Sequence, residues 1–143
     1  MNNTTIGNKR ENELCMLFQK HHYWAHICSK NASGSQPVDV IAIRGASGIL
    51  AWLVDAKNVE ASKPSFVLDR IEDNQWASLQ YAHGFSGIPI ENLGFAVFFE
   101  RMDKFYWLPL EKALDMKKNN VKSINLELMR EFEEVLNEYD NQQ

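Results

Sequence analysis

The sequence has 143 residues, 45% of them hydrophobic, which is enough for one domain with a buried core and too few for two ordinary domains. Its two cysteines lack the spacing of a disulfide framework or a zinc site, and it shows neither a signal-peptide pattern nor an apolar run of membrane-spanning length. We therefore expect a single soluble, cytoplasmic domain over residues 1–143, with flexible ends at 1–7 and about 140–143.

The net charge is −4, but the acidic residues are concentrated near the C-terminus. Residues 127–143 carry six acidic residues and one basic residue, a balance of −5, so the preceding 126 residues sum to +1. The acidic balance therefore does not exclude a nucleic-acid partner. It does argue against tight non-specific binding over the whole surface, because that binding scales with the phosphates that Lys and Arg neutralise.

The N-terminal half predicts one helix followed by three strands. Apolar residues at helical spacing indicate a helix over 9–22, and aromatic and β-branched residues indicate a strand over 23–28. A polar segment with glycine and proline predicts a loop over 31–37. Two nearly continuous apolar runs, 38–43 and 49–56, flank a Gly-Ala-Ser-Gly turn, so we expect a hairpin of central strands covered on both faces.

The C-terminal half predicts further strands and helices around two irregular stretches, 58–68 and 84–93. Asp69 is the expected N-cap of the helix that follows the first stretch. The predicted elements are strands over 94–100 and 105–108 and helices over 69–83, near 110–118 and about 125–139. This order predicts an α/β domain with a central mixed β-sheet flanked by helices.

Two acidic residues and a lysine lie on the predicted hairpin. Asp55 and Lys57 share one face of their strand because successive side chains alternate, and Asp39 on the neighbouring strand can then lie within a few ångströms of Asp55. Carboxylate oxygens, with the Ala56 carbonyl as a further donor, suit Mg²⁺ or Mn²⁺. Lys57 would orient a water or stabilise charge on phosphoryl oxygens.

Charged residues at strand ends are usually solvated, so an Asp-x-Lys triplet alone is weak support for a site. Two aspartates within apolar central strands are less ordinary, because an unpaired buried charge is costly, and their coincidence favours a functional site. Glu11 in the first helix is the best candidate for a third carboxylate. Glu13 lies about 200° further round that helix and cannot point at the same place.

With these residues in place, the chain resembles the PD-(D/E)XK nuclease superfamily, and within it the Holliday-junction resolvases. Residues 7–14, 23–25 and 38–42 are similar to the archaeal-type resolvases. Gln75 and the downstream segments are similar to the bacterial RecU-type resolvases, the segments being 94–97, 105–109 and 122–124. The resemblance extends from Gly7 to about Phe132.

This resemblance implies a restriction-endonuclease-like fold over a single nuclease domain. It implies a Mg²⁺- or Mn²⁺-dependent endonuclease that nicks branched DNA in recombination and repair, as a homodimer that places two active sites on opposing strands. By the same resemblance Glu11, Asp39 and Asp55 bind metal, Lys57 is the catalytic lysine, and Gln75 supports the site from the next helix.

Candidate DNA contacts come from the predicted loop and from basic residues near the site in sequence. The loop corresponds to a flexible segment near the scissile strand in related resolvases, which makes Ser33 and Ser35 candidates. Basic residues can bind phosphates, although each is individually more often a solvated charge. The basic candidates are Lys9, Arg10, Lys30, Arg44, Lys63 and Arg70.

Two alternatives to a junction resolvase remain open. The sequence has no long central insertion that would correspond to the junction-binding stalk of RecU-type proteins, so a restriction or repair endonuclease acting on duplex DNA could use the same residues. A catalytically silent DNA-binding module of the same fold is the second alternative. The retained set of acidic residues, lysine and glutamine argues against it.

Overall fold

The computed structural model describes residues 3–28, 38–45 and 48–141. Its α-helices are α1 (Asn3–Lys20), α2 (Asp73–Ser86), α3 (Leu110–Lys118) and α4 (Phe132–Asn141). Its strands are β1 (Trp24–Ile27), β2 (Val40–Gly45), β3 (Ile49–Val59), β4 (Ser65–Val67), β5 (Leu93–Phe99), β6 (Lys104–Pro109), β7 (Ser123–Asn125) and β8 (Arg130–Glu131). Three short 3-10 turns complete it, η1 (Leu68–Arg70), η2 (Ile90–Asn92) and η3 (Leu126–Leu128).

Six strands form one mixed sheet in the order β1-β2-β3-β5-β6-β8. β3 and β5 pair in parallel, whereas the other neighbours in this sheet are antiparallel. β4 and β7 form a separate two-stranded antiparallel sheet. The predicted α/β class, the mixed sheet and the β2–β3 hairpin are therefore confirmed.

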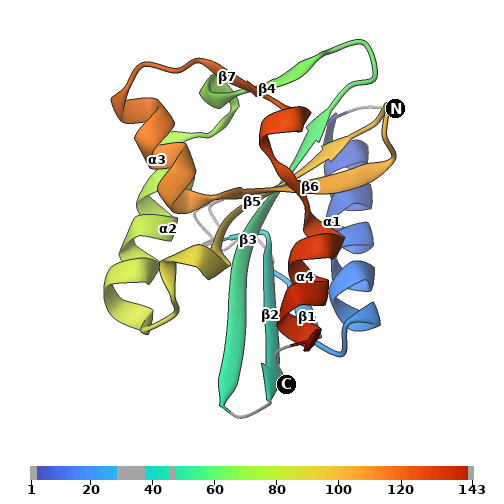
Figure 1. The fold of residues 1–143 in the computed structure, drawn as a ribbon, viewed down its shortest axis with the longest axis vertical. Coiled ribbons are helices and arrows are strands. Elements are labelled where there is room, and N and C mark those ends of the chain that lie inside the picture. The colour runs from blue at the N-terminus through green and yellow to red at the C-terminus, as the bar shows by residue number, and fades with distance from the viewer. Residues whose placement is uncertain (1–2, 29–37, 46–47, 142–143) are drawn as a thin grey trace.

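Helices cover both faces of the large sheet, with α1 and α4 on one side and α2 and α3 on the other (Figure 1). The first layer packs on the sheet through residues such as Phe18 and Phe132, and the second through Trp76 and Leu110. Every residue of β5 is buried, because a central strand between two helical layers exposes neither face.

β3 places the candidate site residues by its alternation. Trp52 and Val54 belong to the core beneath α1 and α4, whereas Val59 belongs to the core beneath α2 and α3. Asp55 and Lys57 lie four and two residues before Val59 on the same strand, so all three side chains point to the same face of the sheet, the one covered by α2 and α3. The strand thereby carries both groups toward the start of α2.

The segment 58–68 is more regular than predicted. β3 continues to Val59 because its pairing with β5 extends to the end of that strand, and β4 follows within the stretch that was expected to be irregular. The following helix also begins later than predicted. Residues 68–70 form η1, and the N-cap of α2 is Glu72 instead of Asp69.

The last helix is shorter than predicted, since it begins at Phe132 and not near residue 125. The preceding residues form β7, the 3-10 turn η3 and β8, because β7 pairs with β4 and β8 pairs with β6. α1 begins at Asn3 and α4 ends at Asn141. Parts of both ends that were expected to be flexible are therefore helical. Within the described ranges, no helix combines the length and the apolar character needed to cross a membrane.

Candidate active site

Asp39 and Asp55 lie side by side where β2 begins. Val40 pairs with Val54, which brings the residue before β2 next to Asp55 on β3. The Asp39 backbone N–H donates to Asp55 Oδ1 at 3.1 Å, and the Ala56 N–H donates to Asp39 Oδ2 at 2.8 Å. Both side chains are buried. Each carboxylate is therefore held by backbone of the other strand.

The Asp55 carboxyl group lies in an environment that disfavours its charge. Burial and, second, the Asp39 carboxylate raise the pKa of Asp55 to about 7, and Lys57 opposes this shift. Asp55 Oδ2 is buried without a hydrogen-bond partner among the described residues. A divalent cation could be coordinated by that oxygen and would reduce the repulsion between the two carboxylates. The pair therefore fits a site for a hard metal ion.

Lys57 is held between β3 and the segment that leads into α2. Its Nζ donates to Gln75 Oε1 at 2.7 Å and to the Arg70 carbonyl at 3.3 Å. Burial lowers the pKa of Lys57, while the charges of Asp55 and Asp39 act in the opposite direction. The ammonium group thus has a defined position beside the carboxylate pair.

Gln75 has two structural tasks through one oxygen. Its Oε1 also accepts a hydrogen bond from the Glu72 backbone N–H at 3.0 Å. The Glu72 side chain in turn accepts one from the Gln75 backbone N–H, which completes a capping box. The position of Lys57 is therefore coupled to the start of α2. Gln75 is a predicted site residue and Glu72 is not, although the Glu-x-x-Gln spacing before a helix is a signal for a capping box.

Glu11 lies on α1 and is half-buried. Its charge contributes to the raised pKa of Asp55 and of the Cys28 thiol, so it acts on the site electrostatically. Across 3–28, 38–45 and 48–141, however, no three His, Cys, Asp or Glu side chains are arranged to hold a metal ion. Asp39 and Asp55 therefore lie together, whereas Glu11 does not form a three-residue metal site with them among the described residues.

A cleft of about 540 Å³ opens beside Lys57. Segments of α1, β3, β4 and η1 line it, together with the connection between β3 and β4. Lys63 and Arg70 are exposed residues of its lining. Lys9 is also exposed and lies at a neighbouring, smaller cleft. Lys30, Ser33 and Ser35 lie outside the described residues.

Arg10 is a predicted phosphate contact, which requires an exposed side chain, but the structure buries this side chain. Its Nε donates to Asn58 Oδ1 at 2.7 Å, its Nη1 donates to Glu13 at 2.9 Å, and its guanidinium lies 3.7 Å from the centre of the Phe98 ring. Asn58 Nδ2 in turn donates to Glu100 at 2.7 Å. Arg10 is thus committed to joining α1 to the ends of β3 and β5.

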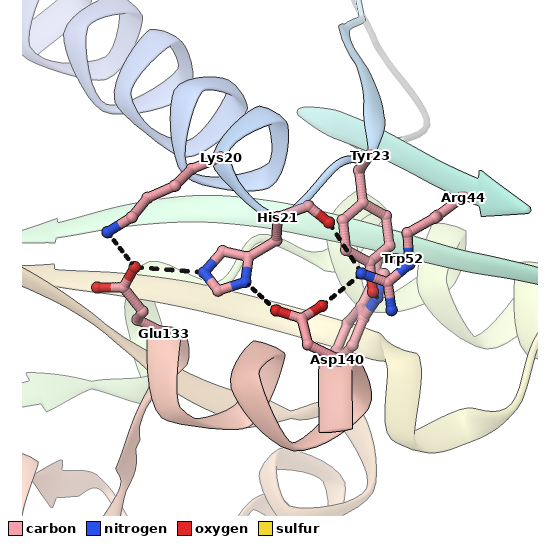
Figure 2. A network of polar contacts seen from close by, with 7 residues as sticks. All are labelled: Lys20, His21, Tyr23, Arg44, Trp52, Glu133 and Asp140. Atoms are coloured by element: carbon pink, nitrogen blue, oxygen red, sulfur yellow. Dashed lines mark hydrogen bonds and ion pairs between the residues drawn. The ribbon is translucent and has the colours of Figure 1, made fainter. Parts of the chain in front are cut away.

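Arg44 is also buried, although it was predicted as a phosphate contact. Its Nη1 donates to the His21 carbonyl at 2.8 Å and to Asp140, and its guanidinium lies over the Tyr23 ring (Figure 2). These contacts join β2 to the end of α1 and to α4. Because the group is enclosed by its own domain, it is a structural residue in this fold.

No family model matches the sequence, and no curated protein sequence matches it. Among solved structures, the chain is similar to Hjc, a Holliday junction resolvase from Archaeoglobus fulgidus, with a TM-score of 0.60 and 17% sequence identity. The similarity covers 92% of this chain and 95% of that one. It shows that the chain has a resolvase-like, restriction-endonuclease-like fold over nearly its whole length.

Proposed function

We propose that this protein is a metal-dependent DNA endonuclease whose reaction centre is Asp39, Asp55 and Lys57. The observation that carries the proposal is the buried carboxylate pair, in which Asp55 Oδ2 lacks a hydrogen-bond partner among the described residues. An arrangement that penalises charge so strongly is typical of a site built for a cation. The adjoining cleft supports a phosphate-bearing substrate, because four of its lining residues are basic.

Asp39 and Asp55 are the proposed ligands of Mg²⁺ or Mn²⁺, with the Ala56 carbonyl as a further donor. When bound, such an ion polarises the scissile phosphate and lowers the pKa of a water. Glu11 is proposed as an additional carboxylate that acts from α1, since its charge already influences Asp55. Mg²⁺ retains several waters in protein sites, so two protein carboxylates suffice as direct ligands.

Lys57 is proposed to donate to the phosphoryl oxygens that gain charge during cleavage. Its bonds to Gln75 and to the Arg70 carbonyl orient the ammonium group before substrate binds. Gln75 acts through Lys57 and is a positioning residue. Burial lowers the pKa of Lys57, which makes its proton easier to transfer than that of an exposed lysine.

The proposed substrate is branched DNA, in the context of recombination or repair. Its support is the similarity to a protein that is named as a Holliday junction resolvase. Resolution of a four-way junction cuts two strands, so the proposal includes a homodimer with one site in each subunit. Duplex cleavage of the restriction or repair type is the competing assignment, because it would use the same chemistry.

Substitution of Asp55 by Asn tests the reaction centre. We expect D55N to abolish Mg²⁺-dependent cleavage of a four-way junction while leaving junction binding in EDTA within about threefold, since the exchange keeps the side-chain shape. Asp115→Asn on the exposed surface of α3 is the matched control and should cleave normally. Cleavage by D55N at the wild-type rate would show that the reaction centre lies elsewhere.

A substrate panel tests the specificity. Four-way junction, flap, linear duplex and single strands are incubated with Mg²⁺ or Mn²⁺, and nicking is followed on labelled strands. Preferential paired nicking of the junction supports the resolvase assignment, and equal cutting of linear duplex favours the restriction or repair type. DNA binding without nicking by either metal would indicate a catalytically silent module.

A further inference from the structure

The cleft beside Lys57 contains more basic groups than the reaction itself uses. Lys57 belongs to the reaction centre, and Arg10 is committed to Asn58 and Glu13. The other two basic side chains of the lining belong to Lys63 and Arg70. Neither forms an ion pair with any residue in the described part of the chain.

Arg70 is fixed close to the reaction centre by two backbone contacts. Its Nη1 donates to the Asn58 carbonyl on β3, and its own carbonyl accepts a hydrogen bond from Lys57 Nζ at 3.3 Å. A guanidinium has five N–H donors, so the group keeps donors for a ligand in the cleft. Arg70 can therefore bind an anion that lies adjacent to the group that Lys57 contacts.

The remaining walls of the cleft suit the rest of a nucleotide. Ile6, Val59 and Val67 give it apolar surface, and Glu60 is the one acidic residue in its lining within the described ranges. Its volume of about 540 Å³ lies in the range of small-molecule sites and can hold a phosphate together with a sugar or base. Basic residues along a groove are a feature of surfaces that follow the backbone of a single strand.

We propose that this cleft receives the nucleotide next to the scissile phosphate, with Lys63 and Arg70 binding its phosphate and the wall at Ile6 and Val67 packing against its sugar or base. This inference rests on the proposed function, because it takes Lys57 as the contact to the scissile phosphate. It assigns a path to the cleaved strand, which runs from the Asp39–Asp55 pair along η1 and β4.

The test measures the salt dependence of DNA binding in EDTA, which requires no cleavage. A labelled junction and a labelled single strand are titrated with wild-type protein and with the double variant Lys63→Gln and Arg70→Gln. Loss of two phosphate contacts should reduce the slope of log K against log salt by about 1.8 for duplex arms and about 1.4 for a single strand. The matched control is Lys117→Gln with Lys118→Gln, which removes the same charge from the exposed end of α3.

A second variant probes the cleft without changing either basic residue. Val67 is 42% exposed on β4, so Val67→Glu should fold and place a carboxylate in the lining. We expect at least tenfold weaker DNA binding for Val67→Glu, and no such loss for Val121→Glu, which alters an equally exposed valine outside the cleft. Circular dichroism and a urea titration check that each variant is folded.

The outcomes separate this inference from the proposed function. An unchanged slope in the Lys63 and Arg70 variant, or an equal fall in the α3 control, overturns the assignment of the cleft even if the wild type cuts DNA. If the salt slope falls only in the Lys63 and Arg70 variant and the wild type nicks no DNA with either metal, the cleft is supported as a DNA-binding site and the nuclease proposal is overturned. Absence of DNA binding by the wild type overturns both.

Discussion

Asp55 is a buried acidic side chain whose surroundings disfavour its charged form. Asp55 is 2% exposed, and the Asp39 side chain is buried beside it. A buried carboxylate beside another carboxylate destabilises the ionised form, and so the pKa of Asp55 rises. The same two features make the pair receptive to a divalent cation.

The pH dependence of unfolding tests this interpretation in metal-free protein. Because the pKa of Asp55 is raised from 3.8 to about 7, the folded state keeps a proton that the unfolded state releases, and stability falls as pH rises through this window. Asp55→Asn removes the penalty, so at pH 8 in EDTA it should raise the free energy of unfolding by up to about 4 kcal/mol. Urea titrations from pH 4 to pH 8 measure the difference.

Magnesium provides the matching control for that experiment. A ligand that binds the folded state stabilises it, so Mg²⁺ should raise the unfolding midpoint of the wild type and not that of Asp55→Asn. If wild type and variant show parallel stability curves over the whole pH range, the Asp55 carboxyl group is not destabilised by its surroundings.

Gln75 links Lys57, the proposed catalytic lysine, to the start of α2 through a single side-chain oxygen. Gln75→Leu removes the acceptor for Lys57 Nζ and for the Glu72 N–H, so we expect a loss of about 1 kcal/mol in stability and at least tenfold slower cleavage. Gln75→Glu keeps the acceptor oxygen and should retain the stability. Urea unfolding and single-turnover cleavage measure the two effects, with Gln80→Leu on the exposed side of α2 as the control.

A loss of stability without a change in cleavage rate would show that Gln75 only caps the helix. Equal cleavage defects in Gln75→Leu and Gln80→Leu would also contradict a specific role for Gln75.

At the level of elements, α4 is anchored at both its ends by polar side chains (Figure 2). Glu133 in its first turn accepts hydrogen bonds from Lys20 at 2.6 Å and contacts His21 at 3.2 Å. Asp140 in its last turn contacts the other His21 ring nitrogen at 2.6 Å and pairs with Arg44. The helix is thereby joined to the end of α1 and to β2.

Two ion pairs made by α4, Asp140 with Arg44 and Glu138 with Arg130, differ in burial, so we expect unequal losses of stability when each is broken. Asp140→Ala leaves the buried Arg44 guanidinium without its carboxylate and should lower the free energy of unfolding by about 2–3 kcal/mol. Glu138→Ala breaks a pair with Arg130 in which both side chains are about half exposed and screened by solvent, so it should lower the free energy of unfolding far less than Asp140→Ala does. Urea titrations of the two variants at pH 7 make the comparison.

Amide hydrogen exchange in α4 adds a local measurement, since Asp140→Ala should increase exchange in the last turns of the helix first. Equal costs for the two substitutions would show that the Arg44–Asp140 pair contributes no more than an exposed ion pair.

At the level of the whole molecule, the candidate site lies where β2, β3 and the start of α2 meet, beside a cleft that α1 and β4 complete. The described residues form one proposed reaction centre per chain, whereas the proposed cutting of both strands of a junction needs two. We therefore expect a dimer in solution, with a molar mass of twice 16.5 kDa by light scattering.

A dimer should also cleave opposing strands of one junction within the lifetime of a single complex. Strand-specific labels on a supercoiled cruciform measure this, because paired cleavage linearises the plasmid and independent nicking relaxes it. A monomer that nicks one strand at a time would favour the competing assignment of a repair-type endonuclease.

The local patterns of the sequence were sufficient for much of the fold. Continuous apolar runs and a glycine-rich turn predicted β2 and β3, and strand alternation alone put Asp55 and Lys57 on one face. β4, β7 and β8 were missed, because strands of two or three residues have no period to detect and form only through pairing partners distant in the chain.

The class of fold and the hairpin follow from the sequence, because they depend on apolar patterns within single strands and helices, and the same patterns predict Asp39, Asp55 and Lys57 as a candidate centre. Which basic residues face a cleft and which support the fold depends on tertiary contacts. Arg10 and Arg44 are indistinguishable in sequence from Lys63 and Arg70, yet partners more than 40 residues away bury the first two. Burial and charge environment arise from contacts between distant segments, and so they appear only when the chain is folded.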